Sequence, residues 1–366
     1  MIVNHCFNSN CRGIYRMRMY TDPKGKAYEQ VIDLAIQNSE YIVLKVKIPA
    51  KVISCNYKSV LEALKPYLLK TIVAEVDDMD EVKLINNTYC SNAFYSAESY
   101  NFYKCCAESG NILKQIANRL SDWIYPNLPE DLCFLKEGGG DYLYSIVHER
   151  MYGMEVTEEE AIELMDRIKG LFLKLEAHRD FDRLLDDAIK HRTDKLYING
   201  HLLTELPDKI GQLTELRDLE IFEQDLYRLP EALFELDKLE RLKIMTADLE
   251  SIPSSIAKLK NLRELSIQCA SSDRPAPRFR IKPKEEISLN RIPSEIGELE
   301  QLEQLTIQYT SIRELPIELT KLKHLRYLNL EICMINQKPD FLNSMKQLEY
   351  INVTQNSLFN IVEVEW

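Results

Sequence analysis

The chain has 366 residues, of which 45% are hydrophobic and 28% are charged, and its formal net charge is −12. This length favours two domains with sizeable cores, and the acidic balance argues against a global nucleic-acid footprint, which needs clustered Lys and Arg. The start lacks a basic and then apolar leader, and no run of eighteen apolar residues occurs, so we expect neither a secretory signal nor a membrane-spanning helix.

The cysteines, nine in number, do not follow the spacing of a disulfide framework. An odd count without such a framework favours reduced thiols in a cytoplasmic protein. His5, Cys6 and Cys11 could form half of a zinc site, but no second ligand pair at a suitable spacing completes it. We therefore predict no metal and no cofactor.

Residues 1–155 are expected to form an α+β domain. Apolar residues at helical or extended spacing predict, in chain order, a helix over 25–40, a strand over 41–47, a helix over 59–70 kinked at Pro66, a strand over 71–76, an edge strand with its loop within the Tyr-rich tract 87–106, and a helix over 112–124. In the last helix, Ile112, Ile116, Leu120 and Trp123 would share one buried stripe. The acidic run Asp77, Asp78, Asp80 and Glu81 indicates a solvated loop more than a paired-carboxylate site.

Two strand-like runs, 132–135 and 142–147, flank the sequence KEGGGD, which predicts a hairpin with a flexible glycine loop. If the second strand continues, His148 and Glu149 point to opposite faces and cannot act together on one substrate atom. Glu130, Asp131 and His148 would then be polar ends of adjacent strands, either a structural tie or a small contact site. An enzyme with a site near Asp131 and His148 is one alternative for this half.

The same region contains the pattern W-x-x-P-N-x-P-E-D-L-x-F…S-x-x-H-E, from Trp123 to Glu149. By this pattern it resembles an uncharacterised group of bacterial proteins associated with toxin-immunity neighbourhoods. The resemblance implies no reaction and no catalytic residue. It keeps open a second alternative, an immunity protein that neutralises a cognate toxin.

Residues 156–192 are predicted to form linking and capping helices. Thr157 and Glu160 form a capping box before an apolar run. Ile162, Met165, Ile168 and Phe172 are expected to continue one buried face. A second short helix follows over 181–189, and the two would cover the open end of the repeats that come next.

From residue 193 the chain repeats itself. Equivalent leucines stand at 216, 239, 262, 302, 325 and 348, in steps of 23, 23, 40, 23 and 23 residues. Each L-x-L predicts a short strand, each following proline (207, 230, 253, 293 and 316) fixes a turn, and I-x-x-L predicts a helical turn that packs inward. A period in the twenties with L-x-x-L-x-L is the signature of leucine-rich repeats.

These residues, 193–366, resemble the 23-residue LxxLPxxI class of leucine-rich repeats found in intracellular bacterial proteins and Ras-group relatives. The resemblance implies a solenoid that binds other macromolecules. The chain departs from the class where many members carry an asparagine ladder, because this position holds His201, Gln224, Ala247, Thr310, Cys333 and Asn356. The fold class predicted for the whole chain is therefore α/β, with this solenoid preceded by a separate α+β domain.

On the predicted concave face, the residues between the buried ones are candidate contacts to a protein partner, because aromatic residues, Met and Arg often anchor interfaces. These candidates are Tyr197, Glu220, Phe222, Arg241, Lys243, Gln268, Gln308, Tyr327, Asn329, Tyr350 and Asn352. The alternative is a solvated face with scattered aromatic residues.

The insertion over 269–286 holds a local basic cluster, Arg274, Arg278, Arg280, Lys282 and Lys284. It is either a site for an acidic partner or phosphate groups, or a tolerated surface loop. The P-loop, G-x-G-x-x-G, H-E-x-x-H and G-x-S-x-G motifs are absent. The leading hypothesis is thus a non-enzymatic cytoplasmic interaction protein, whose N-terminal domain is a second docking element, with neither nucleic acid nor membrane as partner.

Overall fold

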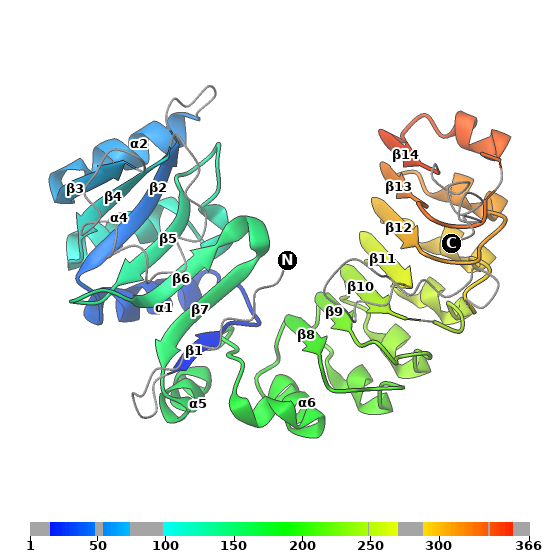
Figure 1. The fold of residues 1–366 in the computed structure, drawn as a ribbon, viewed down its shortest axis with the longest axis horizontal. Coiled ribbons are helices and arrows are strands. Elements are labelled where there is room, and N and C mark those ends of the chain that lie inside the picture. Colours follow the sequence, from blue (N-terminus) through cyan, green and yellow to red (C-terminus); the bar gives the residue numbers. More distant parts are fainter. Residues whose placement is uncertain are drawn as a thin grey trace, which may run out of the picture. The chain divides into compact units, whose positions relative to one another are not determined.

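The computed structural model describes residues 15–47, 54–73, 98–247, 249–269, 288–335 and 337–353. The described residues up to His178 form one compact unit, and those from Arg179 onward form a second (Figure 1). The segment expected as one linking block, 156–192, is divided between the two units. Among the described residues, no helix combines the length and the apolar character needed to cross a bilayer.

The first unit is built on one antiparallel sheet with the strand order β1-β7-β6-β5-β2-β4-β3. Its strands are β1 (Tyr15–Arg18), β2 (Tyr41–Lys47), β3 (Leu68–Val73), β4 (Glu98–Lys104), β5 (Glu130–Leu135), β6 (Asp141–Ile146) and β7 (Met151–Val156). The predicted strand at 41–47 and the hairpin of β5 and β6 are confirmed. The prediction of an edge strand in the Tyr-rich tract is wrong, because β4 pairs with β2 on one side and β3 on the other.

The described helices of this unit include α1 (Lys26–Gln37), α2 (Cys55–Leu64) and α4 (Ala107–Ile116). The helix expected over 59–70 does not continue through Pro66 as a kink. It ends at Leu64, and residues 65–67 form a 3-10 turn that leads into β3. A proline inside a helix lacks the N–H that would bond four residues back, so ending the helix before it avoids that loss.

The helix expected over 112–124 is also shorter than predicted, because it ends at Ile116. Leu120 and Trp123 are buried, but they lie in and after a separate 3-10 turn, so the predicted single stripe is wrong. The Trp123 indole donates to the hydroxyl of Tyr28 (3.0 Å), and that hydroxyl donates to the carbonyl of Leu113 (3.3 Å). These hydrogen bonds join α1, α4 and the turn.

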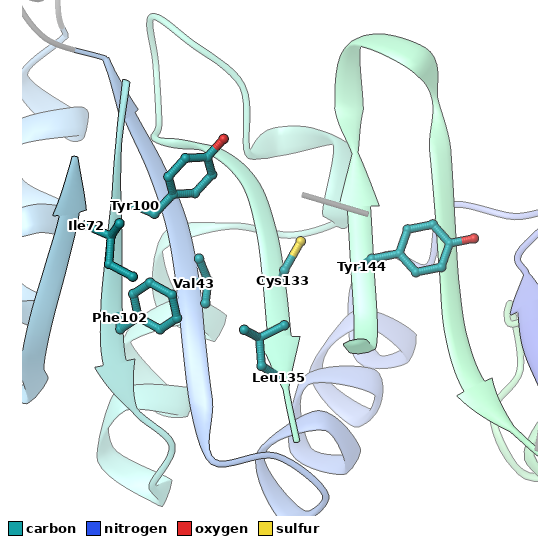
Figure 2. Close-up of a cluster of buried hydrophobic side chains, with 7 residues drawn as sticks. All are labelled: Val43, Ile72, Tyr100, Phe102, Cys133, Leu135 and Tyr144. Carbon is teal, nitrogen blue, oxygen red and sulfur yellow. The ribbon is translucent and has the colours of Figure 1, made fainter. Parts of the chain in front are cut away.

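Figure 2 shows part of the core, a cluster of buried side chains from β2, β3, β4, β5 and β6. The cluster consists of Val43, Ile72, Tyr100, Phe102, Cys133, Leu135 and Tyr144. Phe102 and Tyr100 stand two residues apart on β4, as expected for side chains on one face of a strand. The sheet is therefore held by aliphatic and aromatic packing.

The expectation of reduced thiols fails at one position, because Cys133 is disulfide-bonded. Cys55, Cys105, Cys106, Cys269 and Cys333 form no disulfide. The pKa of the Cys105 thiol is raised to about 12, mainly by burial and to a smaller extent by the neighbouring Cys106 and Glu40. Since the thiolate is the nucleophile, this thiol is unreactive at neutral pH.

The capping box predicted at Thr157 is present at the start of α5 (Glu158–Arg167). The Glu160 amide donates to the Thr157 hydroxyl (3.2 Å), and the Thr157 amide donates to the Glu160 carboxylate (2.8 Å). Ile162 does not join the buried face as expected, since it is 37% exposed. The helix ends at Arg167, and its buried stripe is set by Ala161, Leu164 and Met165.

Replacing Thr157 with alanine is expected to destabilise α5 by about 1 kcal/mol, because the Glu160 amide loses its acceptor. Hydrogen–deuterium exchange of the amides in the first turn of α5 measures the effect as faster exchange. Thr157→Ser keeps the hydroxyl and is the matched control. Equal exchange rates in the alanine and serine variants would contradict this prediction.

The second unit begins with α6 (Phe181–Lys190), where a helix over 181–189 was predicted, and continues as a parallel sheet in sequence order. The strands are β8 (Lys195–Asn199), β9 (Asp218–Phe222), β10 (Arg241–Thr246), β11 (Glu264–Cys269), β12 (Gln304–Gln308), β13 (Tyr327–Asn329) and β14 (Tyr350–Asn352). Equivalent residues face each other: Leu265 lies opposite Leu242 on one side and Leu305 on the other. The 40-residue step therefore leaves the register unchanged.

The turns between the strands follow the predicted pattern. Each of the five predicted prolines precedes a five-residue 3-10 turn, as Pro339 also does in the last repeat, and the φ angle of each is between −62° and −73°. The turn isoleucines Ile210, Ile256 and Ile296 are buried. At Gly297 a Cβ atom would lie 2.5 Å from the Glu318 carbonyl oxygen of the next turn, so adjacent turns require glycine there.

No regular asparagine ladder joins the repeats in the described residues. Varied polar groups bond the backbone near this position. The buried Glu223 carboxylate accepts from the amides of His201 (2.8 Å) and Leu203 (3.3 Å), and the Thr246 hydroxyl donates to the Leu226 carbonyl (2.5 Å). These bonds satisfy backbone groups that would otherwise be buried without a partner.

Candidate functional site

In the sheet of the second unit, the outward side chains at equivalent positions of neighbouring strands form rows. We call the surface made by these rows the strand face. Along each strand these outward side chains alternate with inward leucines and isoleucines, which are almost completely buried in β8–β13. The register aligns three rows: Lys195, Asp218, Arg241, Glu264, Gln304, Tyr327, Tyr350; Tyr197, Glu220, Lys243, Ser266, Thr306, Asn329, Asn352; and Asn199, Phe222, Met245, Gln268, Gln308. At about 4.8 Å per strand the strand face is roughly 30 Å long.

The first half of the strand face carries a network of ion pairs around Arg241. Its guanidinium lies 3.0 Å from Asp218, 2.7 Å from Glu220 and 3.1 Å from Glu264. Lys195 adds a 3.9 Å contact to Asp218. The Arg241 side chain is only 13% exposed. Its charge is therefore compensated within the strand face.

The pKa values of these carboxyl groups reflect burial and the neighbouring cations. Burial raises the pKa of Asp218, although Arg241 and Lys195 oppose this shift. Burial alone would also raise the pKa of Glu220, but Arg241 and Lys195 outweigh it and the net shift is downward. For Arg241, burial opposes the charged form, while the three carboxylates raise its pKa overall. The network thus depends on Arg241.

The second half of the strand face consists mainly of amides and aromatic rings. The Gln268 amide donates to Gln308 (2.8 Å), whose own amide donates to Glu331 (3.0 Å). The rings of Tyr327 and Tyr350 are stacked, with centroids 4.4 Å apart and planes 5° apart. These contacts orient the side chains of this half relative to one another.

All eleven predicted contact residues lie on the strand face, but they are not equally available. Gln308 and Asn329 are each only 9% exposed, and Arg241 is engaged by three carboxylates. Tyr350, at 42%, is far more accessible. The predicted basic cluster, Arg274, Arg278, Arg280, Lys282 and Lys284, lies outside the described residues.

Sequence reasoning missed the contacts within the strand face, although the repeat period contains the signal for them. Tyr327 and Tyr350 are 23 residues apart, one period, so equal register positions place their rings side by side. Gln268 and Gln308 are separated by one period plus the insertion and are equally aligned. Exposed Gln304, in the row of the tyrosines, was not among the predicted contacts.

The polar site predicted in the first unit is organised around a buried aspartate. Asp131 is 5% exposed, has a φ angle of +56°, and accepts a hydrogen bond from the Val147 amide (3.0 Å). Burial raises the pKa of Asp131, and the Val147 amide, Lys45 and His148 counteract it. This carboxyl group connects the start of β5 to the end of β6, which supports the structural tie.

His148 and Glu149 do not lie on opposite faces of a strand as expected. β6 ends at Ile146, and residues 147–149 form a 3-10 turn that ends at Arg150 in the left-handed conformation. The turn brings the Nε2 atom of His148 within 3.9 Å of a Glu149 carboxylate oxygen. Both side chains are more than half exposed. Neither has the burial that tunes catalytic groups.

A cavity of about 370 Å³ lies in the first unit and is lined by residues of α1, β6, β7, α5 and the loop between β5 and β6, among them Lys136, Tyr142, Glu155, Glu163 and Arg167. Lys136 and Glu155 pair with each other at 2.9 Å. The charges are of both signs, so the lining favours no single class of ligand. Nowhere in the described ranges do three or more His, Cys, Asp or Glu residues form a group that could hold a metal ion.

No protein-family model and no curated protein matches the chain. Solved structures match it in part. The LRR protein LIC12759 of Leptospira interrogans is 25% identical, with a TM-score of 0.30 over 45% of this chain and 50% of that one. This chain thus spans half the length of LIC12759. An internalin (inlF) from Listeria monocytogenes is 17% identical, with a TM-score of 0.33 over 45% and 43%.

The leucine-rich repeat domain of the type III effector XCV3220 (XopL) is 23% identical, with a TM-score of 0.30 over 46% of this chain and 58% of that one. Scores this low add no argument of their own. The decisive observation is internal: seven parallel strands stack in register, and each inward leucine meets its equivalent in the next repeat. The second unit is a leucine-rich-repeat solenoid.

Proposed function

We propose that the chain is an interaction protein and that its solenoid binds a partner protein across the strand face. The observation that carries the proposal is the composition of this surface. Tyr197, Phe222, Tyr327 and Tyr350 stand among hydrogen-bonding side chains on one continuous sheet. Aromatic residues that rise from a polar surround are the usual anchors of protein interfaces.

The strand face is also preorganised, which lowers the entropy lost on binding. Backbone hydrogen bonds tie each strand to the repeat before it, such as that from the Glu264 amide to the Glu240 carbonyl (3.0 Å) and that from the Tyr350 amide to the Arg326 carbonyl (3.0 Å). A length of roughly 30 Å suits one small domain or a helix, which corresponds to an interface of standard size.

Three further elements belong to the proposal. The first unit acts as a second docking element, the basic segment within 269–286 contacts an acidic group of the partner, and the chain works in the cytoplasm. The other two hypotheses from the sequence, an immunity protein against a toxin and an enzyme acting near Asp131 and His148, gain no observation of their own from the described residues.

Replacing Thr306 with arginine is expected to weaken partner binding more than tenfold. Thr306 lies at the centre of the strand face, where a long charged side chain blocks contact. Thr320→Arg is the matched control, because Thr320 is also half-buried but lies in the 3-10 turn at 317–321. The full chain is used as bait in a lysate of its source cells, and captured proteins are quantified by mass spectrometry.

The expected result is one protein captured equally by the unmodified chain and by Thr320→Arg, and strongly reduced with Thr306→Arg. Equal capture by both variants would show that the strand face is not the binding surface. Capture by the unmodified chain that does not exceed the background of resin without bait would contradict the proposal as a whole.

A further inference from the structure

The two halves of the strand face differ in the charge they can offer to a partner. In the first half, three cations (Lys195, Arg241 and Lys243) balance three anions (Asp218, Glu220 and Glu264), and Arg241 contacts all three carboxylates. A partner that drew on Arg241 or on its three carboxylates would have to break ion pairs that are already formed and partly buried. That exchange contributes little net affinity.

The second half offers uncharged groups instead. We call it the tyrosine–amide patch and define it as Gln268, Gln304, Thr306, Tyr327, Tyr350 and Asn352. One nearby anion, Glu331, accepts a hydrogen bond from Gln308 (3.0 Å), which is itself nearly buried, and two others, Glu303 and Glu349, pair with Arg263 and Arg326. Gln304 is exposed and stands beside Tyr327 in the same row.

Within the patch, Tyr350 has the properties of an anchor. The residue is 42% exposed, so it has apolar area left to bury, and its ring stacks on the ring of Tyr327, with the two centroids 4.4 Å apart. A ring supported in this way loses little freedom on binding. A pair of aromatic rings is stabilised beyond the burial of apolar area alone. The amides around it can donate to and accept from a peptide backbone.

We propose that the strand face recognises its partner through the tyrosine–amide patch, and that the docking part of the partner is an uncharged polypeptide segment with an aromatic side chain. This inference rests on the proposed function and specifies the chemistry of the partner. If the contacts are uncharged, the affinity for the partner depends little on ionic strength. A basic partner attracted by the net charge of −12 would bind less tightly in salt, whereas contacts between uncharged groups are hardly screened.

The experiment uses the full chain, immobilised, and a random peptide library displayed on phage. One selected peptide is synthesised, and its Kd is measured by isothermal titration calorimetry. The selected peptides are expected to be uncharged and to share an aromatic residue. The Kd is expected to change less than threefold between 50 and 500 mM NaCl.

Tyr350→Ala is expected to raise the Kd of that peptide at least tenfold. Tyr227→Ala is the matched control, because Tyr227 is equally exposed (40%) but lies outside the strand face, where its hydroxyl bonds Glu205. The Kd of the peptide for Tyr227→Ala is expected to differ less than twofold from that for the unmodified chain. Gln304→Arg, at an exposed position, tests the patch independently if Tyr350→Ala lowers the thermal stability, and it too is expected to raise the Kd at least tenfold.

Three results would overturn the inference. In the first, the selected peptides are charged, their binding depends on salt, and it is lost in Lys243→Ala but not in Tyr350→Ala. This result would place recognition in the other half of the strand face and would leave the proposed function intact. Peptides that bind every strand-face variant equally would contradict both proposals. A library that yields no peptide dependent on Tyr350 or Gln304 would overturn the patch.

Discussion

Replacing Leu265 with alanine is expected to lower the free energy of unfolding of the solenoid by about 2–5 kcal/mol, the range for removing a large aliphatic side chain from a core. Leu265 is completely buried in β11. It lies between Leu242 of the repeat before and Leu305 of the repeat after the insertion. Because each repeat is stabilised by its neighbours, a cavity here weakens two interfaces at once.

Urea unfolding of the full chain, followed by circular dichroism, measures the loss. Ile317→Ala is the matched control, since Ile317 is 54% exposed in a 3-10 turn and its truncation is expected to change stability by less than about 0.5 kcal/mol. Similar midpoints for the Leu265 and Ile317 variants would mean that β11 does not bridge the two parts of the solenoid.

Replacing Arg241 with methionine is expected to destabilise the solenoid by about 2 kcal/mol at neutral pH. Removing one partner of a buried ion pair costs about 3–5 kcal/mol, and the partial exposure of these carboxylates reduces that figure. Without the guanidinium, Asp218 and Glu220 remain close together, and Lys195 and Lys243 compensate them only in part. The pKa of each carboxyl group therefore rises in the folded variant.

The sign of the pH dependence follows from linkage. A carboxyl group whose pKa is raised by folding binds its proton more tightly in the folded state, so it favours folding increasingly as the pH falls through the folded pKa. In the unmodified chain this applies to Asp218, whereas the lowered pKa of Glu220 acts in the opposite direction and its contribution is lost in acid. In Arg241→Met both groups act like Asp218.

The deficit of Arg241→Met relative to the unmodified chain is therefore expected to shrink between about pH 7 and about pH 4, near the unfolded pKa values of Asp and Glu. Urea midpoints at both pH values test this. Arg228→Met is the control, because Arg228 pairs with Glu205 and Glu250 in an exposed position. It should show little loss and no pH trend. A deficit that stays constant with pH would count against the network.

The repeats were predictable because their physics is local and recurs. Leu219 and Ile221 define the same strand as Leu242 and Ile244, and one period fixes which residues point inward. The prolines also act locally, since each restricts its own φ angle. For this reason the strands, the turns and all members of the strand face could be placed from the sequence.

The first unit was less predictable because its elements depend on distant partners. β4 became an interior strand only because β3 and β2, more than twenty residues earlier in the chain, pair with both of its edges. The short turn at 147–149 ended β6 where an extended pattern continued. On the strand face, burial of Gln308 and Asn329 depends on side-chain packing between repeats, which the period alone does not specify.

The spacing of ion pairs along the solenoid has a consequence for how the chain can vary. Arg217 pairs with Glu240 and Arg326 with Glu349 at a separation of one period, and Arg263 pairs with Glu303 across 40 residues in the same arrangement. The repeats on either side of the insertion therefore pack in the same way as repeats that are connected by fewer residues. The position between Cys269 and Ser288 is therefore an insertion site, where segments of different length and chemistry can be exchanged while the surrounding repeats keep their packing.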